Sequence, residues 1–74
     1  MMAEKSSEIT KLVNIATDME LATELRTKAM EQLGNLGTHE ALLALLDLAA
    51  NTALIREERE LALKYAREII RSGD

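Results

Sequence analysis

The residues of this chain with the best-known chemistry are a histidine and the glutamate that follows it. His39-Glu40 begins like the zinc-binding motif H-E-x-x-H, in which two histidines one helical turn apart share a metal ion. Position 43 is a leucine, and the chain contains no second histidine. A single imidazole supplies one of the three or four ligands that zinc needs. We therefore interpret His39 as a surface residue in the first turn of a helix and predict no metal site.

Serine and carboxylate side chains are the other candidates for catalysis. A nucleophilic serine needs a neighbouring base, and none stands near Ser6, Ser7 or Ser72, which are interpreted as caps or frayed ends. Glu20 and Glu24 have helical spacing on a solvated face, where nothing raises a carboxyl pKa for general acid catalysis. Without cysteine there is no thiolate chemistry. We predict a chain that is not an enzyme, with no catalytic residue, cofactor or small-molecule substrate.

Two glycines three residues apart, Gly34 and Gly37, raise the possibility of a phosphate-binding loop. Such a loop follows a strand and has a lysine beside it, and the sequence offers neither around these glycines. Glycine also takes the left-handed conformation that ends a helix without strain. We expect one or both glycines to end a helix and to let the chain reverse.

Length and composition limit the elements that can position these residues. A chain of 74 residues forms one domain, and with one Tyr and no Phe or Trp its core must be aliphatic. Apolar residues recur at helical spacing. Capping residues divide the chain into four helices: one capped by Ser6 or Ser7, one capped by Thr17 or Asp18 and ending near Gly34 or Gly37, one capped by Thr38 over about 40–50, and one beginning at Asn51 or Thr52 over about 54–71.

Short connections make these helices two antiparallel hairpins, over about 7–36 and 38–72, after a mobile segment over residues 1–6. Sliding the chain by 33 residues aligns the apolar stripes of both hairpins. The same offset places Asp18 on Asn51 and Arg26 on Arg59. Coincident polar residues favour an internal duplication over a four-helix bundle without repeats.

The two aligned arginines lie at the edges of their apolar arcs. Arginines in such places bury their stems and donate hydrogen bonds to carbonyls or to an Asx residue in a turn. Binding of phosphate would need more positive neighbours, whereas Glu24, Glu57 and Glu58 lie nearby. We favour a structural role for Arg26 and Arg59.

Several residues of the chain resemble the sequence pattern of a known family. Leu25-Arg26, Ala29, Leu33-Gly34, Leu36-Gly37 and the run over 40–46 are similar to a short, LG-containing bacterial HEAT repeat. The family ties successive repeats together by hydrogen bonds between an Asp in the turn and a later Val-Arg. The resemblance covers about residues 7–71. It implies an all-α stack of two hairpins that binds other proteins or scaffolds them, with inter-repeat roles for Asp18, Arg26, Asn51 and Arg59.

Two departures from the family pattern bear on that expectation. The proline common in the first helix of a repeat is absent, and Glu58 stands where an apolar residue usually precedes the arginine. The second unit therefore matches less closely than the first.

A net charge of −4 argues against a nucleic-acid partner. The stretch LGNLGTHEALLALL superficially resembles a helix-turn-helix, which keeps a small all-α nucleic-acid-associated regulator as the alternative function. Its second helix offers leucine and alanine where a groove-reading helix needs polar side chains. No apolar run is long enough to span a bilayer, and the first residues lack the apolar core of a signal peptide. We therefore expect no membrane partner and, by default, a cytoplasmic protein.

The second hairpin is more apolar than the first, since Leu61 and Tyr65 stand where the first has Lys28 and Gln32. These side chains could simply fold inward. Alternatively, they form a patch that binds another protein or a second copy, giving a homodimer. Tyrosine is a favoured interface anchor. The interface residues predicted on this reading are Leu43, Leu48, Leu61, Tyr65 and Ile70.

Overall fold

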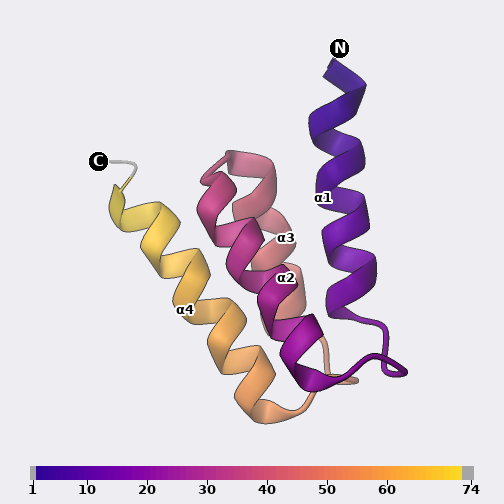
Figure 1. Ribbon diagram of the computed structural model, residues 1–74. Coiled ribbons are helices and arrows are strands. Elements are labelled where there is room, and N and C mark those ends of the chain that lie inside the picture. The colour runs from indigo at the N-terminus through magenta and orange to yellow at the C-terminus, as the bar shows by residue number, and fades with distance from the viewer. Residues whose placement is uncertain (1, 73–74) are drawn as a thin grey trace.

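The regular secondary structure of the described residues is entirely α-helical. The computed structural model describes residues 2–72, with side chains from residue 7 onward. Its four helices are α1 (Met2–Ala16), α2 (Thr23–Leu36), α3 (His39–Ala49) and α4 (Arg56–Ser72), and no strand occurs within these residues. Figure 1 shows that consecutive helices run in opposite directions. The predicted all-α class with two helical hairpins is confirmed: α1 and α2 form hairpin one, and α3 and α4 form hairpin two.

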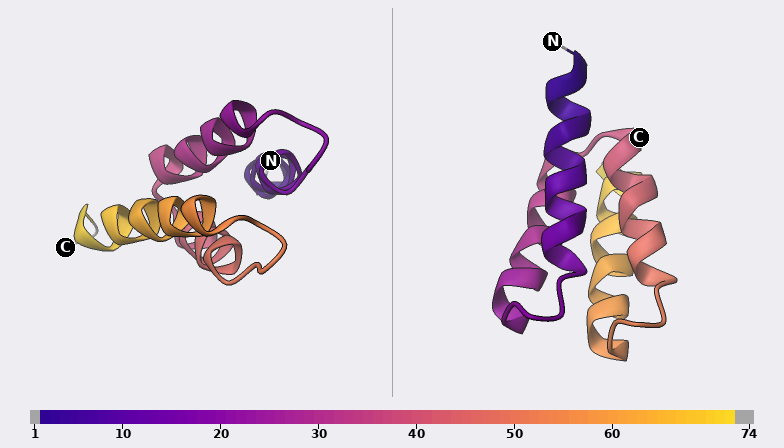
Figure 2. Two further views of the ribbon diagram at one scale, coloured as in Figure 1. Left: turned by 90° about the horizontal axis from the view of Figure 1, so that it is seen from below. Right: turned by 90° about the vertical axis from the view of Figure 1, so that its right-hand side faces the viewer.

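The two hairpins pack side by side in two layers. In the first layer α1 lies against α3, and in the second α2 lies against α4, while α2 also contacts α3 (Figure 2). Within the described residues α1 and α4 do not contact each other. Hairpin one therefore covers one face of hairpin two, and each hairpin keeps one outer face.

The core between these helices is aliphatic, as the composition predicts. Its largest fully buried apolar side chains are Met30, Leu33, Leu45 and Leu54. Buried alanines on all four helices, such as Ala62, replace bulkier residues at the contacts. Small side chains let helix backbones approach closely, so a core without a large aromatic ring can still be tightly packed.

The bounds of the helices repeat along the chain. α1 ends at Ala16 and α3 at Ala49, 33 residues later, and the same separation divides the starts of α2 at Thr23 and α4 at Arg56. The two hairpins thus follow the register that the sequence alignment predicts, as expected from an internal duplication.

The connection inside each hairpin contains the same kind of hydrogen-bonded turn. The Asp18 carboxylate accepts a hydrogen bond from the Glu20 amide at 3.0 Å, and the Asn51 side-chain oxygen accepts one from the Ala53 amide at 2.9 Å. Aspartate and asparagine favour this turn because their short side chains reach the amide two residues on. The aligned Asp and Asn therefore shape the connections.

These turns correct two predicted helix starts. α2 begins after Ala22, which makes no side-chain cap, so Thr17 and Asp18 are not its caps. α4 begins at Arg56 rather than at Asn51 or Thr52. Asp18 and Asn51 instead accept hydrogen bonds within the turns that precede α2 and α4.

The first helix also begins earlier than predicted. α1 starts at Met2, so a cap at Ser6 or Ser7 is wrong. Met1 and the side chains of residues 1–6, to which the predicted mobility refers, lie outside the described part of the chain.

The reversal between the hairpins follows the prediction closely. Gly37 ends α2 in the left-handed conformation, with φ +65°. Thr38 caps α3 by accepting a hydrogen bond from the Ala41 amide at 3.0 Å. Gly34 lies inside α2 and does not end it.

We expect Gly37→Ala to lower the free energy of unfolding by about 1 to 2 kcal/mol, because a Cβ is crowded in the left-handed conformation. Urea denaturation followed by circular dichroism measures this effect. Gly37→Asn is the matched control, since asparagine tolerates this conformation better. Equal losses in the two variants would contradict the assignment.

Candidate functional site

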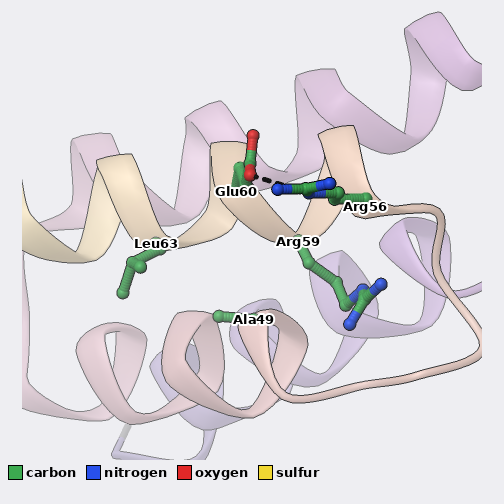
Figure 3. Close-up of a pocket in the computed structure, with 5 residues that line it drawn as sticks. All are labelled: Ala49, Arg56, Arg59, Glu60 and Leu63. Carbon is green, nitrogen blue, oxygen red and sulfur yellow. Dashed lines mark hydrogen bonds and ion pairs between the residues drawn. The ribbon is translucent and has the colours of Figure 1, made fainter.

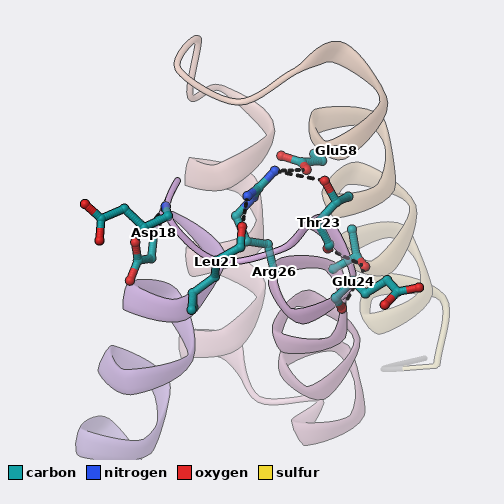
Figure 4. Close-up of polar contacts among 8 residues, drawn as sticks. Asp18, Leu21, Thr23, Glu24, Arg26 and Glu58 are labelled. Carbon is teal, nitrogen blue, oxygen red and sulfur yellow. Dashed lines mark hydrogen bonds and ion pairs between the residues drawn. The ribbon is translucent and has the colours of Figure 1, made fainter.

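A buried ion pair joins the two hairpins. Arg26 on α2 and Glu58 on α4 are 8% and 2% exposed, and the Arg26 Nη2 atom lies 2.6 Å from Glu58 Oε2 (Figure 4). A hydrogen bond between two charged groups is stronger than one between neutral groups. The pair fixes how hairpin two sits on hairpin one.

Further hydrogen bonds hold the Arg26 side chain in place. Its guanidinium donates to the Leu21 carbonyl oxygen and, over 3.2 Å, to the Thr23 hydroxyl oxygen. Arg26 Nε and Glu58 Oε1 are buried and have no hydrogen-bond partner among the described residues. Of the two acceptors predicted for this arginine, a carbonyl or an Asx residue in the turn, the structure shows the carbonyl.

The inter-repeat contact differs from the one that the family resemblance implies. Arg26 reaches across to Glu58, while the Asp18 carboxylate stays in its own exposed turn. Asn51 likewise caps its own turn. The sequence did not lead us to predict Glu58 as the partner of Arg26. The one feature that could have indicated it is the charge of Glu58 at a position where an apolar residue is expected.

Arg59 occupies in hairpin two the position of Arg26 in hairpin one. Its Nε atom is buried without a hydrogen-bond partner, and the side chain makes no hydrogen bond or ion pair within the described residues. It lines a surface pocket of about 250 Å³ between α3 and α4, together with Ala49, Arg56, Glu60 and Leu63 (Figure 3). Arg56 and Glu60 pair at 3.2 Å in solvent, where such a pair contributes little.

The outer face of hairpin one carries a second, apolar groove. This groove has a volume of about 180 Å³. Its lining comes from α1 and α2: Leu12, Ile15, Leu25, Lys28, Ala29 and Gln32. The pocket and the groove lie on the two outer faces of the pair of hairpins.

The structure corrects part of the predicted interface. Leu48 is 2% exposed and belongs to the core, so it cannot line a surface patch. Leu61 and Tyr65 are half-buried, whereas Leu43 and Ile70 are exposed. A methyl group added to Gly34 would lie 3.2 Å from Tyr65 Cβ. Tyr65 therefore packs against hairpin one, on the inner face of hairpin two.

His39 is exposed in the first turn of α3, as predicted. Within the described residues, no group of three or more acidic or histidine side chains is arranged to hold a metal ion. None of the four described helices combines the length and apolar character needed to cross a bilayer. No family model, curated protein or solved structure matches the chain. The outer faces of the hairpins are therefore the features from which a function can be inferred.

Burial raises the pKa of the Tyr65 phenol above its usual value, and the Glu31 and Glu68 carboxylates raise it further while Lys28 lowers it. A raised pKa in the folded state means that folding is favoured while the phenol stays protonated. The contribution of the protonated phenol to the free energy of unfolding is present below the unfolded-state pKa of about 10, and it is lost as the pH rises through the folded-state pKa.

We expect the phenolate absorbance at 295 nm to appear at higher pH in the folded chain than in the urea-unfolded chain. Tyr65 is the only tyrosine and there is no tryptophan, so the signal is unambiguous. In Tyr65→Phe, the loss of stability above pH 10 should be smaller than in the wild type. Identical titrations of the folded and unfolded chains would contradict this prediction.

Proposed function

We propose that this chain is a non-catalytic protein-binding module of the HEAT-like type, which binds its partner through the outer face of hairpin two. We define this outer face by Leu46, Ala49, Arg59 and Leu63. It is the counterpart, 33 residues on, of the face by which hairpin one binds hairpin two.

The repeated face is the observation that carries the proposal. In hairpin one it consists of Val13, Ala16, Arg26 and Met30, of which the last three are buried and the first is packed against the core. In hairpin two the corresponding side chains are apolar again around an arginine, but no helix of the described chain covers them. A face of this composition binds a helical hairpin within the molecule, which supports the same use on the outside.

The chemistry of this outer face favours a protein over a nucleic acid. The face presents aliphatic side chains, and Glu57 and Glu60 flank the arginine. α3, the helix that would read a groove, has no Lys, Arg, Asn or Gln. Recognition of DNA or RNA needs clustered positive charge, and no described feature favours the alternative function.

Site-specific photo-crosslinking tests the proposal. A photoreactive residue at position 46 or 63 should give a discrete protein adduct when the chain is irradiated in an extract of the cells that naturally express it. Position 64 is the control, because Lys64 is exposed and points about 140° away from Arg59 around α4. Absence of an adduct at 46 and 63, or the same adduct at 64, would overturn the proposal. Salt-dependent retention on heparin or DNA would favour the nucleic-acid alternative.

A further inference from the structure

We infer that the partner of this outer face is a helical hairpin that presents a carboxylate to Arg59, in the way that Glu58 is presented to Arg26. The inference rests on the proposed function and adds the chemistry by which the partner is recognised.

The internal interface supplies the template for this contact. Glu58 lies in the first turn of α4, the second helix of its hairpin, and reaches Arg26 across the hairpin boundary. Around it, Tyr65 contacts Gly34 of α2. A hairpin that bound the outer face in the same way would place the corresponding carboxylate beside Arg59.

Arg59 requires such a carboxylate once the face is covered. Arg26 has the turn carbonyl, a threonine hydroxyl and Glu58 as partners, whereas Arg59 has none within the described chain and its Nε is already out of solvent. A guanidinium does not lose its charge in a protein. A partner that removed the remaining water without supplying a negative charge would leave an unpaired buried cation, which is strongly unfavourable. Arg59 therefore selects for an acidic residue.

A second copy that bound head to tail, through the outer face of its hairpin one, does not meet this requirement. The outer face of hairpin one has Leu25 at the position of Glu58 and Lys28 at the position of Leu61. If that face bound the outer face of hairpin two, Arg59 would meet a leucine and a further cation would lie nearby. In this arrangement the partner is therefore a different hairpin, and the wild-type chain should not associate head to tail.

Two substitutions turn the chain itself into a probe with the required chemistry. Leu25→Glu and Lys28→Leu give the outer face of hairpin one the residues that hairpin two presents to hairpin one. Both positions are exposed, so the fold should persist. Gln32, the counterpart of Tyr65, is not changed to tyrosine. Tyr65 packs against Gly34, and the outer face of hairpin two has Arg67 at the position of Gly34, which leaves no room for the ring. Leu46→Glu is added to block the probe's own outer face and prevent polymerisation.

Titration of this L25E/K28L/L46E probe into the wild-type chain, followed by calorimetry and sedimentation, should show a 1:1 complex. Replacing Leu25→Glu by Leu25→Gln in the probe, or introducing Arg59→Gln in the wild-type partner, should each weaken binding about tenfold or more. Making both changes together should cost little beyond either alone, because they remove the same contact. Lys64→Gln removes an equal charge from the other side of α4 and should leave binding unchanged.

Further variants separate this inference from the proposed function. If Leu63→Glu abolishes the complex while Arg59→Gln does not weaken it, the face binds hairpins but the carboxylate inference is overturned. If the wild-type chain does not bind the probe at all, the inference is overturned, and the crosslinks at positions 46 and 63 decide the proposed function independently. Circular dichroism must show native helicity for every variant used.

Discussion

Arg26→Met is expected to lower the free energy of unfolding by about 3 to 5 kcal/mol, because it leaves Glu58 buried without its charge partner. Glu58 is 2% exposed and has one ion-pair partner within the described chain. Small domains have a total stability of about 5 to 15 kcal/mol, so the variant should be close to unfolding at room temperature. Urea denaturation followed by circular dichroism at 222 nm measures the loss.

Removing both charges should have the opposite consequence. Arg26→Met combined with Glu58→Leu is expected to be near neutral, or to stabilise the chain by about 1 to 4 kcal/mol, because two desolvated charges are replaced by apolar contacts. Arg59→Met is the matched control at the equivalent position. It should change the stability by less than about 1 kcal/mol, since Arg59 has no partner to lose.

Similar losses in Arg26→Met and Arg59→Met would show that the loss in Arg26→Met does not come from leaving Glu58 without its charge partner. A double variant no more stable than Arg26→Met alone would show instead that Glu58 packs through contacts which leucine cannot replace. Either result would remove the internal template on which a carboxylate for Arg59 is inferred.

Local features of the sequence were sufficient to predict that four helices form two hairpins, but not where three of the helices begin. The cap at Thr38 and the left-handed Gly37 depend on residues within one turn of each other, and apolar residues that recur every three or four positions indicate a helix directly. The 33-residue register could also be predicted from the sequence, because the two turns have Asp18 and Asn51 at aligned positions.

The sequence could not predict which apolar face is covered. Ile15 and Leu48 occupy equivalent positions in the two hairpins, yet Ile15 is 37% exposed and Leu48 is 2% exposed. Helical period identifies an apolar stripe, but it does not say which neighbour packs against that stripe. Hairpin one covers one face of hairpin two. The contrast of Leu61 and Tyr65 with Lys28 and Gln32 left two explanations, side chains that fold inward or an open patch, and the structure shows the inward arrangement for Leu48 and Tyr65.

The buried ion pair was missed for a related reason. Arg26 and Glu58 are 32 residues apart in the chain, so no local pattern links them. A glutamate in an apolar stripe is the one trace that the pair leaves in the sequence. Such a residue indicates a long-range partner whenever its neighbours on the stripe are buried.

Leu48→Ala is expected to lower the free energy of unfolding by about 2 to 5 kcal/mol, because it removes buried methyl groups and leaves a cavity in the core. Leu43→Ala is the chemically identical change five residues earlier on the same helix. Leu43 is 49% exposed, so its truncation should cost less than about 1 kcal/mol. Urea denaturation of both variants, with the wild type alongside, gives the difference.

This pair of variants decides between the two arrangements of hairpin two. If Leu48 were on an open patch with Leu43, both truncations would be mild, and Leu48→Ala would instead weaken binding to a partner. A large loss of stability confined to Leu48→Ala places Leu48 on the face that hairpin one covers. The opposite side of hairpin two, with Leu46, Leu63 and the unpaired Arg59, is then the side left for a partner.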